Sequence, residues 1–346
     1  MNITGAGTPF TSQRKQGDEK MRLPVSLIAV LLMATVAQAA SFDCRKATSK
    51  MEHAVCGNPT LSGLDESLAA AYREAKARLS PKAAKTFAAG QGSWHRFTST
   101  YCFTNYSAEA VTQGESNQCL IKAYQQRIKE IEATGKMIAG FKTYLALENR
   151  IKVSPKEQFI YTVERRYIQL DDDSSLGAKL NDFLAFKDKV QLEDSRGSEA
   201  YTVTLANPSK DWLCKETTAD TFIGPYPNTS KSCGAYAISL GRPLFIRDLF
   251  SGQEWTKIAI AAARRHFAEL ARKNPEFTLD MVIGYDQFQL KPDQVFPYCF
   301  GARGIYVDGF MVHAVKEFDG VTIPWETFGK VLTPYARQQI RSLTDN

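Results

Sequence analysis

The chain has 346 residues, of which 44% are apolar, 23% charged and 11% aromatic, a composition typical of globular proteins. This excludes a mostly disordered, collagenous or multi-span membrane protein, and the length predicts two domains or one large one. The formal net charge is +6, but no Lys/Arg-rich run accompanies it. Nucleic acid is therefore not an expected partner.

The first 39 residues have the pattern of a targeting segment. Arg22 precedes a short apolar run over residues 25–36, and the small residues Ala37 and Ala39 follow at positions −3 and −1 of a cleavage site. This pattern is typical of a secretory signal peptide, and the run is too short for a comfortable membrane span. We expect residues 1–39 to be an upstream extension and signal peptide, cleaved near Ala39. The expected location is periplasmic or secreted.

Residues 41–135 predict a small all-helical unit. Leu61, Leu64, Leu68 and Tyr72 recur at steps of three and four, the period of one helix face. Two further segments with similar spacing follow, and Thr134-Gly135 ends the last one.

Four cysteines of the helical unit predict two disulfides. Cys44 and Cys56 flank a short segment, and Cys102 and Cys119 end one helix and start the next. The favoured pairs are 44–56 and 102–119, because each closes a short loop. In the chain-entropy model, a loop of this size stabilises the fold by about 3 kcal/mol, which matters in a domain with a small core.

The remaining cysteines are Cys214, Cys233 and Cys299. The favoured interpretation pairs 214 with 233 and leaves Cys299 free, while 214–299 and 233–299 stay open. No Cys-x-x-Cys pair is present, so a metal site is not expected.

After residue 135 the pattern changes. Residues 136–160 predict a connector with some helical character, and residues 161–346 predict a second domain. Within it, residues 201–205 alternate as a half-buried strand does, and an Ala-rich helix is expected from Glu254 to Lys273. The predicted fold class is α+β: a disulfide-stapled all-helical domain, then an α+β domain with a mostly antiparallel sheet packed by helices.

No pattern indicates catalysis. After residue 39 there is no Gly-x-Ser-x-Gly and no Ser-x-x-Lys, and the four histidines form no zinc motif. The run from Asp171 to Ser174 lacks the spacing of a calcium loop, so we interpret it as a helix N-terminus with capping side chains. We expect no enzyme activity, catalytic residue, metal or cofactor.

The helical unit carries a long ordered set of motifs: Cys, Cys, Leu-Asp, Tyr, Gln-x-x-Trp, Cys, Cys-Leu and Tyr-x-x-Arg-Ile. The residues that carry it are Phe42, Asp43, Cys44, Glu52, Cys56, Leu61, Leu64, Asp65, Leu68, Ala71, Tyr72, Gln91, Trp94, Arg96, Cys102, Cys119, Leu120, Tyr124, Arg127 and Ile128. Because the motifs occur in this order, residues 41–135 resemble the N-terminal domain family named after the lysozyme inhibitor LprI.

The second unit carries shorter motifs. They are Gly234-Ala235-Tyr236, residues 240–244 (Leu-Gly-Arg-Pro-Leu), residues 247–250 (Arg-Asp-Leu-Phe) and residues 321–325 (Val-Thr-Ile-Pro-Trp). With these, residues from about 155 to 346 resemble the C-terminal domain of the anti-sigma factor RsiV and of related envelope proteins. Relatives often have Gly-Gly-Ala-His where this chain has Cys233 to Tyr236.

Both resemblances imply a lysozyme as partner, because each family includes members that bind one. We therefore predict an exported periplasmic protein that binds a lysozyme or another muramidase and acts by steric occlusion, without catalysis. The turn-rich loop over residues 222–228 and the family motif give the candidate contacts Pro225, Tyr226, Gly234 and Tyr236.

The alternative is a structural or stress-related binding module of the cell envelope with a non-lysozyme partner. Without residues 1–39 the chain carries 39 basic and 35 acidic side chains, a net charge of +4. Many lysozymes are strongly basic, so the chain provides no attractive net field for them. The alternative therefore stays open.

Overall fold

The computed structural model describes residues 40–104, 111–138, 140–154, 159–187, 197–206, 211–222, 228–273, 291–307 and 321–344. The expected signal peptide and the candidate contacts Pro225 and Tyr226 lie outside these ranges. Within them, no helix combines the length and the hydropathy needed to cross a bilayer.

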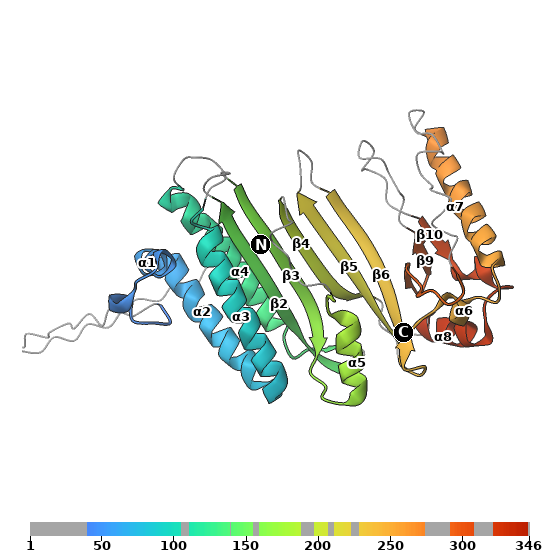
Figure 1. The fold of residues 1–346 in the computed structure, drawn as a ribbon, viewed down its shortest axis with the longest axis horizontal. Coiled ribbons are helices and arrows are strands. Elements are labelled where there is room, and N and C mark those ends of the chain that lie inside the picture. The colour runs from blue at the N-terminus through green and yellow to red at the C-terminus, as the bar shows by residue number, and fades with distance from the viewer. Residues whose placement is uncertain are drawn as a thin grey trace, which may run out of the picture. The chain divides into compact units, whose positions relative to one another are not determined.

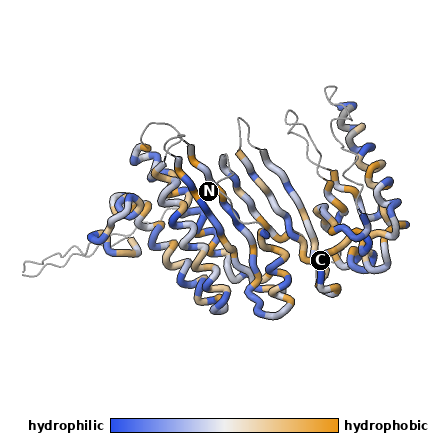
Figure 2. The backbone as a smooth tube through the Cα atoms, in the orientation of Figure 1, coloured by the Kyte–Doolittle hydropathy of each residue, from blue (hydrophilic) through white to orange (hydrophobic). Residues whose placement is uncertain are grey.

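The N-terminal region is helical, as the sequence predicts. Its elements are η1 (Cys44–Lys46), α1 (Lys50–Gly57), α2 (Pro59–Ala77), α3 (Pro81–Tyr101) and α4 (Gln113–Glu132). A polar capping residue precedes each of the four α-helices. These residues are, in chain order, Ser49, Asn58, Ser80 and Thr112. Their side-chain oxygens accept backbone N–H groups that the first turn leaves without a partner. Figure 2 shows both hydrophilic and hydrophobic stretches on these helices, as expected where one face is buried.

The disulfides Cys44–Cys56 and Cys102–Cys119 confirm the two predicted pairs of this region. They tie η1 to α1 and the end of α3 to α4.

Among the described residues, seven strands form one sheet in the order of the sequence. They are β1 (Met137–Ile138), β2 (Phe141–Ser154), β3 (Phe159–Leu170), β4 (Ser198–Ala206), β5 (Trp212–Phe222), β6 (Asn228–Ala237) and β7 (Arg242–Pro243). The pair β3–β4 is parallel and the other pairs are antiparallel. Helix α5 (Ser175–Leu184) lies in the connection between β3 and β4. The predicted α+β class and the mostly antiparallel sheet are confirmed.

The structure differs from the prediction over residues 136–160, where strands β1 and β2 replace the expected connector. Strand β2 is buried on both sides, because Tyr144, Ala146 and Leu147 are all buried although they point to different sides. The sequence therefore lacks the alternation of apolar and polar residues that marks a half-exposed strand. Helix α3 runs beside β2 in Figure 1, and the apolar core of the helices continues into β2. The helical region therefore shares its core with the sheet.

Two small residues allow α3 to approach β2 closely. A Cβ atom on Gly90 would lie 3.2 Å from the backbone nitrogen of Leu147, so a side chain there would push the helix away. One turn later the Ser93 hydroxyl accepts the backbone N–H of Asn149 at 2.8 Å and donates to its carbonyl at 3.1 Å. Strand β1 pairs with β2 at only one end of β2. Further along, α3 provides the hydrogen-bond partner for the backbone N–H and C=O of Asn149.

The C-terminal region packs against the β5–β6 part of the sheet. Its elements are α6 (Ile246–Leu249), α7 (Glu254–Lys273), β8 (Cys299–Gly301), β9 (Gly304–Val307), β10 (Val321–Pro324), η4 (Trp325–Phe328) and α8 (Pro334–Thr344). The predicted helix from Glu254 to Lys273 is confirmed. Trp212 of β5 enters the core of this region, where its ring meets Phe300 edge-on at 5.1 Å and its indole N–H donates to the Tyr335 hydroxyl at 2.8 Å.

The predicted pair Cys214–Cys233 is wrong, because the disulfide joins Cys233 of β6 to Cys299 of β8 and leaves Cys214 as a buried thiol. The strand register explains the difference. Cys214 lies opposite Ala235, and Cys233 lies opposite Glu216, so the two cysteines are diagonal neighbours rather than partners across the sheet. The Cys214 side chain is packed in the apolar core.

Candidate functional site

The predicted contacts Gly234 and Tyr236 do not form an exposed loop. Both lie within β6 and are buried, and Tyr236 is only 3% exposed with its ring 5.6 Å from that of Phe183. They contribute to the core on the α5 side of the sheet. The prediction of a partner contact at these two residues is therefore wrong.

The motif residues of the helical unit meet in the interior of the fold. The Tyr124 hydroxyl donates to the Asp65 carboxylate at 3.0 Å, and the Trp94 ring meets the Tyr124 ring edge-on at 5.3 Å. Asp65 also accepts the backbone N–H of Ser41 at 2.8 Å. Burial and the neighbouring Asp65 carboxylate raise the pKa of Tyr124, so this phenol stays protonated and serves as a fixed donor.

Arg127 begins a chain of alternating charges that runs from α4 to β3. Its guanidinium donates to the Gln91 side chain at 2.9 Å and lies 3.1 Å from the Glu130 carboxylate. Glu130 is 3.4 Å from Arg166, and Arg166 is 2.7 Å from Glu164. The two cations and two anions balance, as burial demands.

Burial shifts the pKa values at both ends of this chain. It lowers the pKa of the Arg127 guanidinium, and the Glu130 carboxylate beside that group opposes the shift. It raises the pKa of the Glu164 carboxyl, and the Arg166 guanidinium opposes this shift. Arg127 still carries its charge near neutral pH, because arginine starts from a very high pKa.

A hollow of about 270 Å³ opens beside this chain, between α3, α4 and β3. We call it the aromatic hollow. Its wall consists of Trp94, Phe97, Tyr101 and the Cys102–Cys119 disulfide, and the Arg127–Glu164 charge chain lies at its polar side. The rings of Phe97 and Tyr101 stack at 5.4 Å. An apolar wall with a few convergent polar groups is the usual form of a ligand site.

A second hollow of about 370 Å³ lies over the neighbouring strands. We call it the strand hollow. It is lined by Thr162, Glu164, Ser198, Glu199, Ala200, Asp220, Thr221, Phe222 and Thr229. Neither lining combines a nucleophile with a histidine base.

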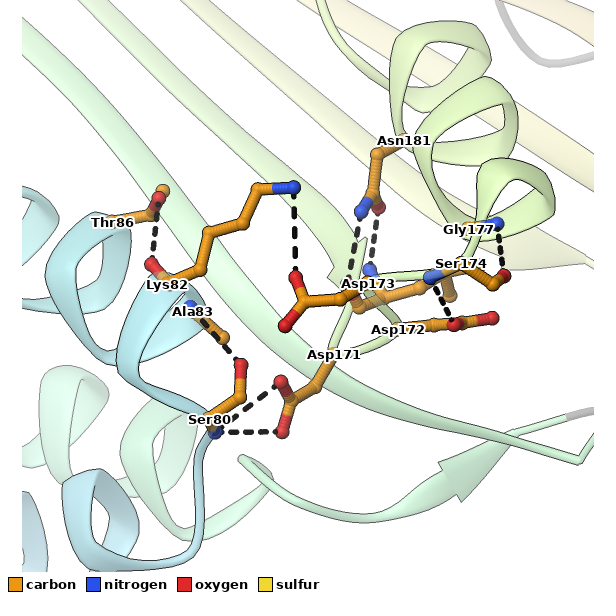
Figure 3. Close-up of polar contacts among 11 residues, drawn as sticks. Ser80, Lys82, Ala83, Thr86, Asp171, Asp172, Asp173, Ser174, Gly177 and Asn181 are labelled. Atoms are coloured by element: carbon orange, nitrogen blue, oxygen red, sulfur yellow. Dashed lines mark hydrogen bonds and ion pairs between the residues drawn. The ribbon is translucent and has the colours of Figure 1, made fainter.

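The acidic run after β3 caps helices, which confirms the sequence interpretation. Figure 3 shows Asp172 accepting the backbone N–H of Ser174, whose hydroxyl in turn accepts the N–H of Gly177 at the start of α5. Asp171 accepts the backbone N–H of Ser80 at the start of α3, at 3.1 Å. The run therefore joins the N-termini of two helices.

Within the described residues, one group has the spacing of metal ligands: Glu216 with Cys233 and Cys299. Both sulfurs belong to the disulfide, so neither is the thiolate that a soft metal needs. This donor set does not fit a metal ion.

Sequence patterns do not single out Glu164, Arg166 or Asp220, whereas Phe222 opens the predicted turn-rich loop over residues 222–228. A signal exists for Glu164 and Arg166, because polar residues stand at every second position of β3 from Thr162 to Arg166. Asp220 has no comparable signal, because only the register of β3, β4 and β5 brings it near Glu164.

The helical region is similar to a known protein family. Residues 44–131 match the family model described as lysozyme inhibitor LprI. This LprI domain covers about a quarter of the chain and includes both disulfides of the helical region and the α3 and α4 wall of the aromatic hollow. LprI is an inhibitor family, which is consistent with a non-catalytic function.

Two crystal structures of DUF3298 family proteins are also similar, one from Pseudomonas aeruginosa PAO1 and one from Bacteroides fragilis NCTC 9343. They align with 57% and 61% of this chain, and with 96% and 100% of their own chains. The identities are 11% and 12% and the TM-scores 0.44 and 0.42, too low to carry an argument. No curated protein matches the chain, and the resemblance to RsiV stays a prediction.

Proposed function

We propose that this protein is an exported, lysozyme-inhibitor-like binding protein that acts by steric occlusion. The match of residues 44–131 to the LprI family carries the proposal. The family name gives the partner class, a lysozyme or related muramidase. Neither hollow combines a nucleophile with a histidine base.

The construction of the LprI domain supports a rigid docking body. Two disulfides and a core shared with β2 fix the helices, so little conformational freedom remains to be lost on binding. A stable complex buries about 800 Å² on each partner, which is more than one hollow offers. The partner must therefore also contact the surrounding helices.

Charge predicts slow association that salt does not weaken, because salt screens the repulsion between two basic proteins. Residues 40–346 carry a net charge of +4, and a basic lysozyme gains no long-range attraction from it. The association rate constant is then expected near the unsteered value of about 10⁵–10⁶ M⁻¹s⁻¹.

The decisive experiment measures clearance of a bacterial cell suspension by several lysozymes, with and without oxidised protein of residues 40–346. Dose-dependent protection together with direct binding on a biosensor surface is the expected result. Absence of both for every lysozyme would overturn the proposal. Release of soluble muropeptides by the protein alone would replace it with an enzyme.

Export is tested separately, by sequencing the N-terminus of the protein recovered from outside the cytoplasm. Cleavage near Ala39 predicts a chain that starts at residue 40. A recovered chain that retains residues 25–36 would contradict the signal peptide.

A second candidate is a cell-envelope binding module with a non-lysozyme partner. The charge balance favours it, since residues 136–346 carry 27 basic and 26 acidic side chains and residues 41–135 carry 12 and 9. Chemical cross-linking in intact cells, followed by identification of the linked protein, distinguishes the two candidates.

A further inference from the structure

The aromatic hollow and the strand hollow lie on the same side of the sheet and meet at Glu164. Glu164 lines both. Its neighbours at every second position of β3 belong to one hollow each, Thr162 to the strand hollow and Arg166 to the aromatic hollow. Alternate residues of a strand point to the same side, so the two hollows adjoin at Glu164 on one side of the sheet. We call the pair the trough.

Each part of the trough contains an aromatic side chain exposed to solvent. Tyr101 is 37% exposed in the aromatic hollow and Phe222 is 51% exposed in the strand hollow. Of the large apolar side chains that are exposed in the described structure, these two are the aromatic ones, and the others line neither hollow. An exposed ring in each hollow offers a face on which a ligand can stack.

The floor of the strand hollow is rich in hydroxyl and carboxylate groups. Thr162, Ser198 and Thr229 supply hydroxyls, and Glu164 and Asp220 supply carboxylates. The Thr229 hydroxyl donates to Asp220 at 2.7 Å. A carboxylate accepts several hydrogen bonds and a hydroxyl both donates and accepts, so this floor is suited to a ligand with many hydroxyl groups.

The charges argue against an anionic ligand. Arg166 and Arg127 are paired with Glu164 and Glu130, and Lys122 adds a positive charge to the aromatic hollow only. The strand hollow contains carboxylates but neither Lys nor Arg. Phosphate groups and acidic polymers would meet repulsion there. A lipid tail would cover these carboxylates without offering them any further hydrogen bond.

We propose that this trough binds a neutral oligosaccharide, with sugar rings stacked on Tyr101 and Phe222 and their hydroxyl groups bonded to Glu164, Asp220 and the neighbouring hydroxyls. Sugar rings combine an apolar C–H face with hydroxyls around the rim, which matches aromatic residues flanking a polar floor. The two volumes together fall in the range of small-ligand sites, about 300–1,000 Å³. This function does not depend on lysozyme binding.

The test uses oxidised protein of residues 40–346 with chitohexaose and cellohexaose as neutral probes, measured by titration calorimetry. We expect at least one hexasaccharide to bind with a Kd between about 10 μM and 1 mM. The double variant Tyr101→Ala/Phe222→Ala should bind at least about 10-fold more weakly. Asp220→Asn, which keeps the shape of the floor, should weaken binding severalfold.

The matched control is Met137→Ala/Leu240→Ala, which removes two exposed apolar side chains that line neither hollow. Its affinity should equal that of the unmodified protein, and circular dichroism melting should show that all variants are folded. The proposal is overturned if neither hexasaccharide binds below about 1 mM, or if the aromatic double variant binds as the control does. If the double variant instead loses lysozyme binding while no sugar binds, the trough is a protein-docking surface.

Discussion

The LprI domain and the C-terminal region both pack against the seven-stranded sheet, but they are attached to it differently. Helix α3 meets β2 through Gly90 and Ser93, which bring backbone against backbone. The C-terminal region meets β5 and β6 through the large ring of Trp212 and the Cys233–Cys299 disulfide. The interface of α3 with β2 is therefore held by close approach of two backbones. The interface of the C-terminal region with β5 and β6 is held by a large buried ring and a disulfide.

The two regions also differ in how far apart in the sequence their disulfide-bonded cysteines lie. The disulfides of the LprI domain span 12 and 17 residues, whereas Cys233–Cys299 spans 66. A disulfide that closes a longer loop removes more entropy from the unfolded chain. The C-terminal region should therefore depend on its covalent link more than the LprI domain does on either of its own.

The largest predicted effect is the loss of the long-range disulfide. Cys233→Ala/Cys299→Ala should lower the free energy of unfolding by about 4 kcal/mol, and Cys102→Ala/Cys119→Ala by about 3 kcal/mol, in the chain-entropy model. Urea denaturation of both double variants measures the difference. Equal losses would remove the distinction between the two regions.

The same pairing predicts the behaviour of Cys214. Burial raises the pKa of its thiol to about 12, so it should not react with iodoacetamide at pH 8 in the folded protein and should react fully in denaturant. Non-reducing peptide mapping should find residue 233 linked to residue 299. A peptide that links residues 214 and 233 would contradict the structure.

The next effect tests the close approach of α3. Gly90→Val should destabilise the fold by roughly 2–3 kcal/mol, because the new side chain meets the backbone of Leu147. Gly63→Val in α2 is the matched control, since nothing lies within 4 Å of a Cβ at that position. Thermal denaturation should show a clear drop in Tm for the first variant only.

Ser93→Ala should cost about 1–2 kcal/mol, because the backbone N–H and C=O of Asn149 lose their buried partner. Ser67→Ala, which removes an exposed hydroxyl bond within α2, should change stability little. If both variants unfold at the same urea concentration as the unmodified protein, the Ser93 bonds do not hold α3 to the strand.

The smallest effect concerns Asp171, which ties β3 to the start of α3 and lies 2.7 Å from Lys142. Burial alone would raise the pKa of this carboxyl, but the hydrogen bonds from Lys142 and Ser80 outweigh burial and lower it. Asp171→Asn should cost about 1 kcal/mol at neutral pH.

Because the folded pKa of Asp171 is lowered, its contribution is present above the ordinary aspartate pKa of about 4. It is lost as the pH falls through the lower folded value. Urea titrations between pH 7 and pH 2 should therefore show the two proteins converging at the acid end. A gap that stays constant would show that the charge of Asp171 contributes nothing.

The sequence predicted the elements whose information is local. Leu61, Leu64 and Leu68 repeat on one helix face, and the cysteine pairs of the LprI domain close within two helical segments, so both could be inferred from spacing. Strand β2 could not, because Thr143, Tyr144, Ala146 and Leu147 are all buried and the alternation that marks a half-exposed strand is absent.

The trough was even harder to predict from the sequence. Glu164 and Asp220 are 56 positions apart in the sequence, and they meet because β3 pairs with β4 and β4 with β5. Gly234 and Tyr236 are predicted contacts because of the family motif, yet the register of β5 and β6 places them inside the sheet.

The contact of α3 with β2 also limits how a partner can bind. An uncovered edge strand invites a foreign strand to extend the sheet, a common mode of peptide capture. Here Ser93 occupies the backbone groups of Asn149, and the helix lies against Leu147. Along this part of β2, helix α3 therefore blocks the backbone groups to which an incoming peptide would otherwise form hydrogen bonds. Recognition at this side of the molecule must therefore use side chains, on the helices or in the trough, rather than strand addition.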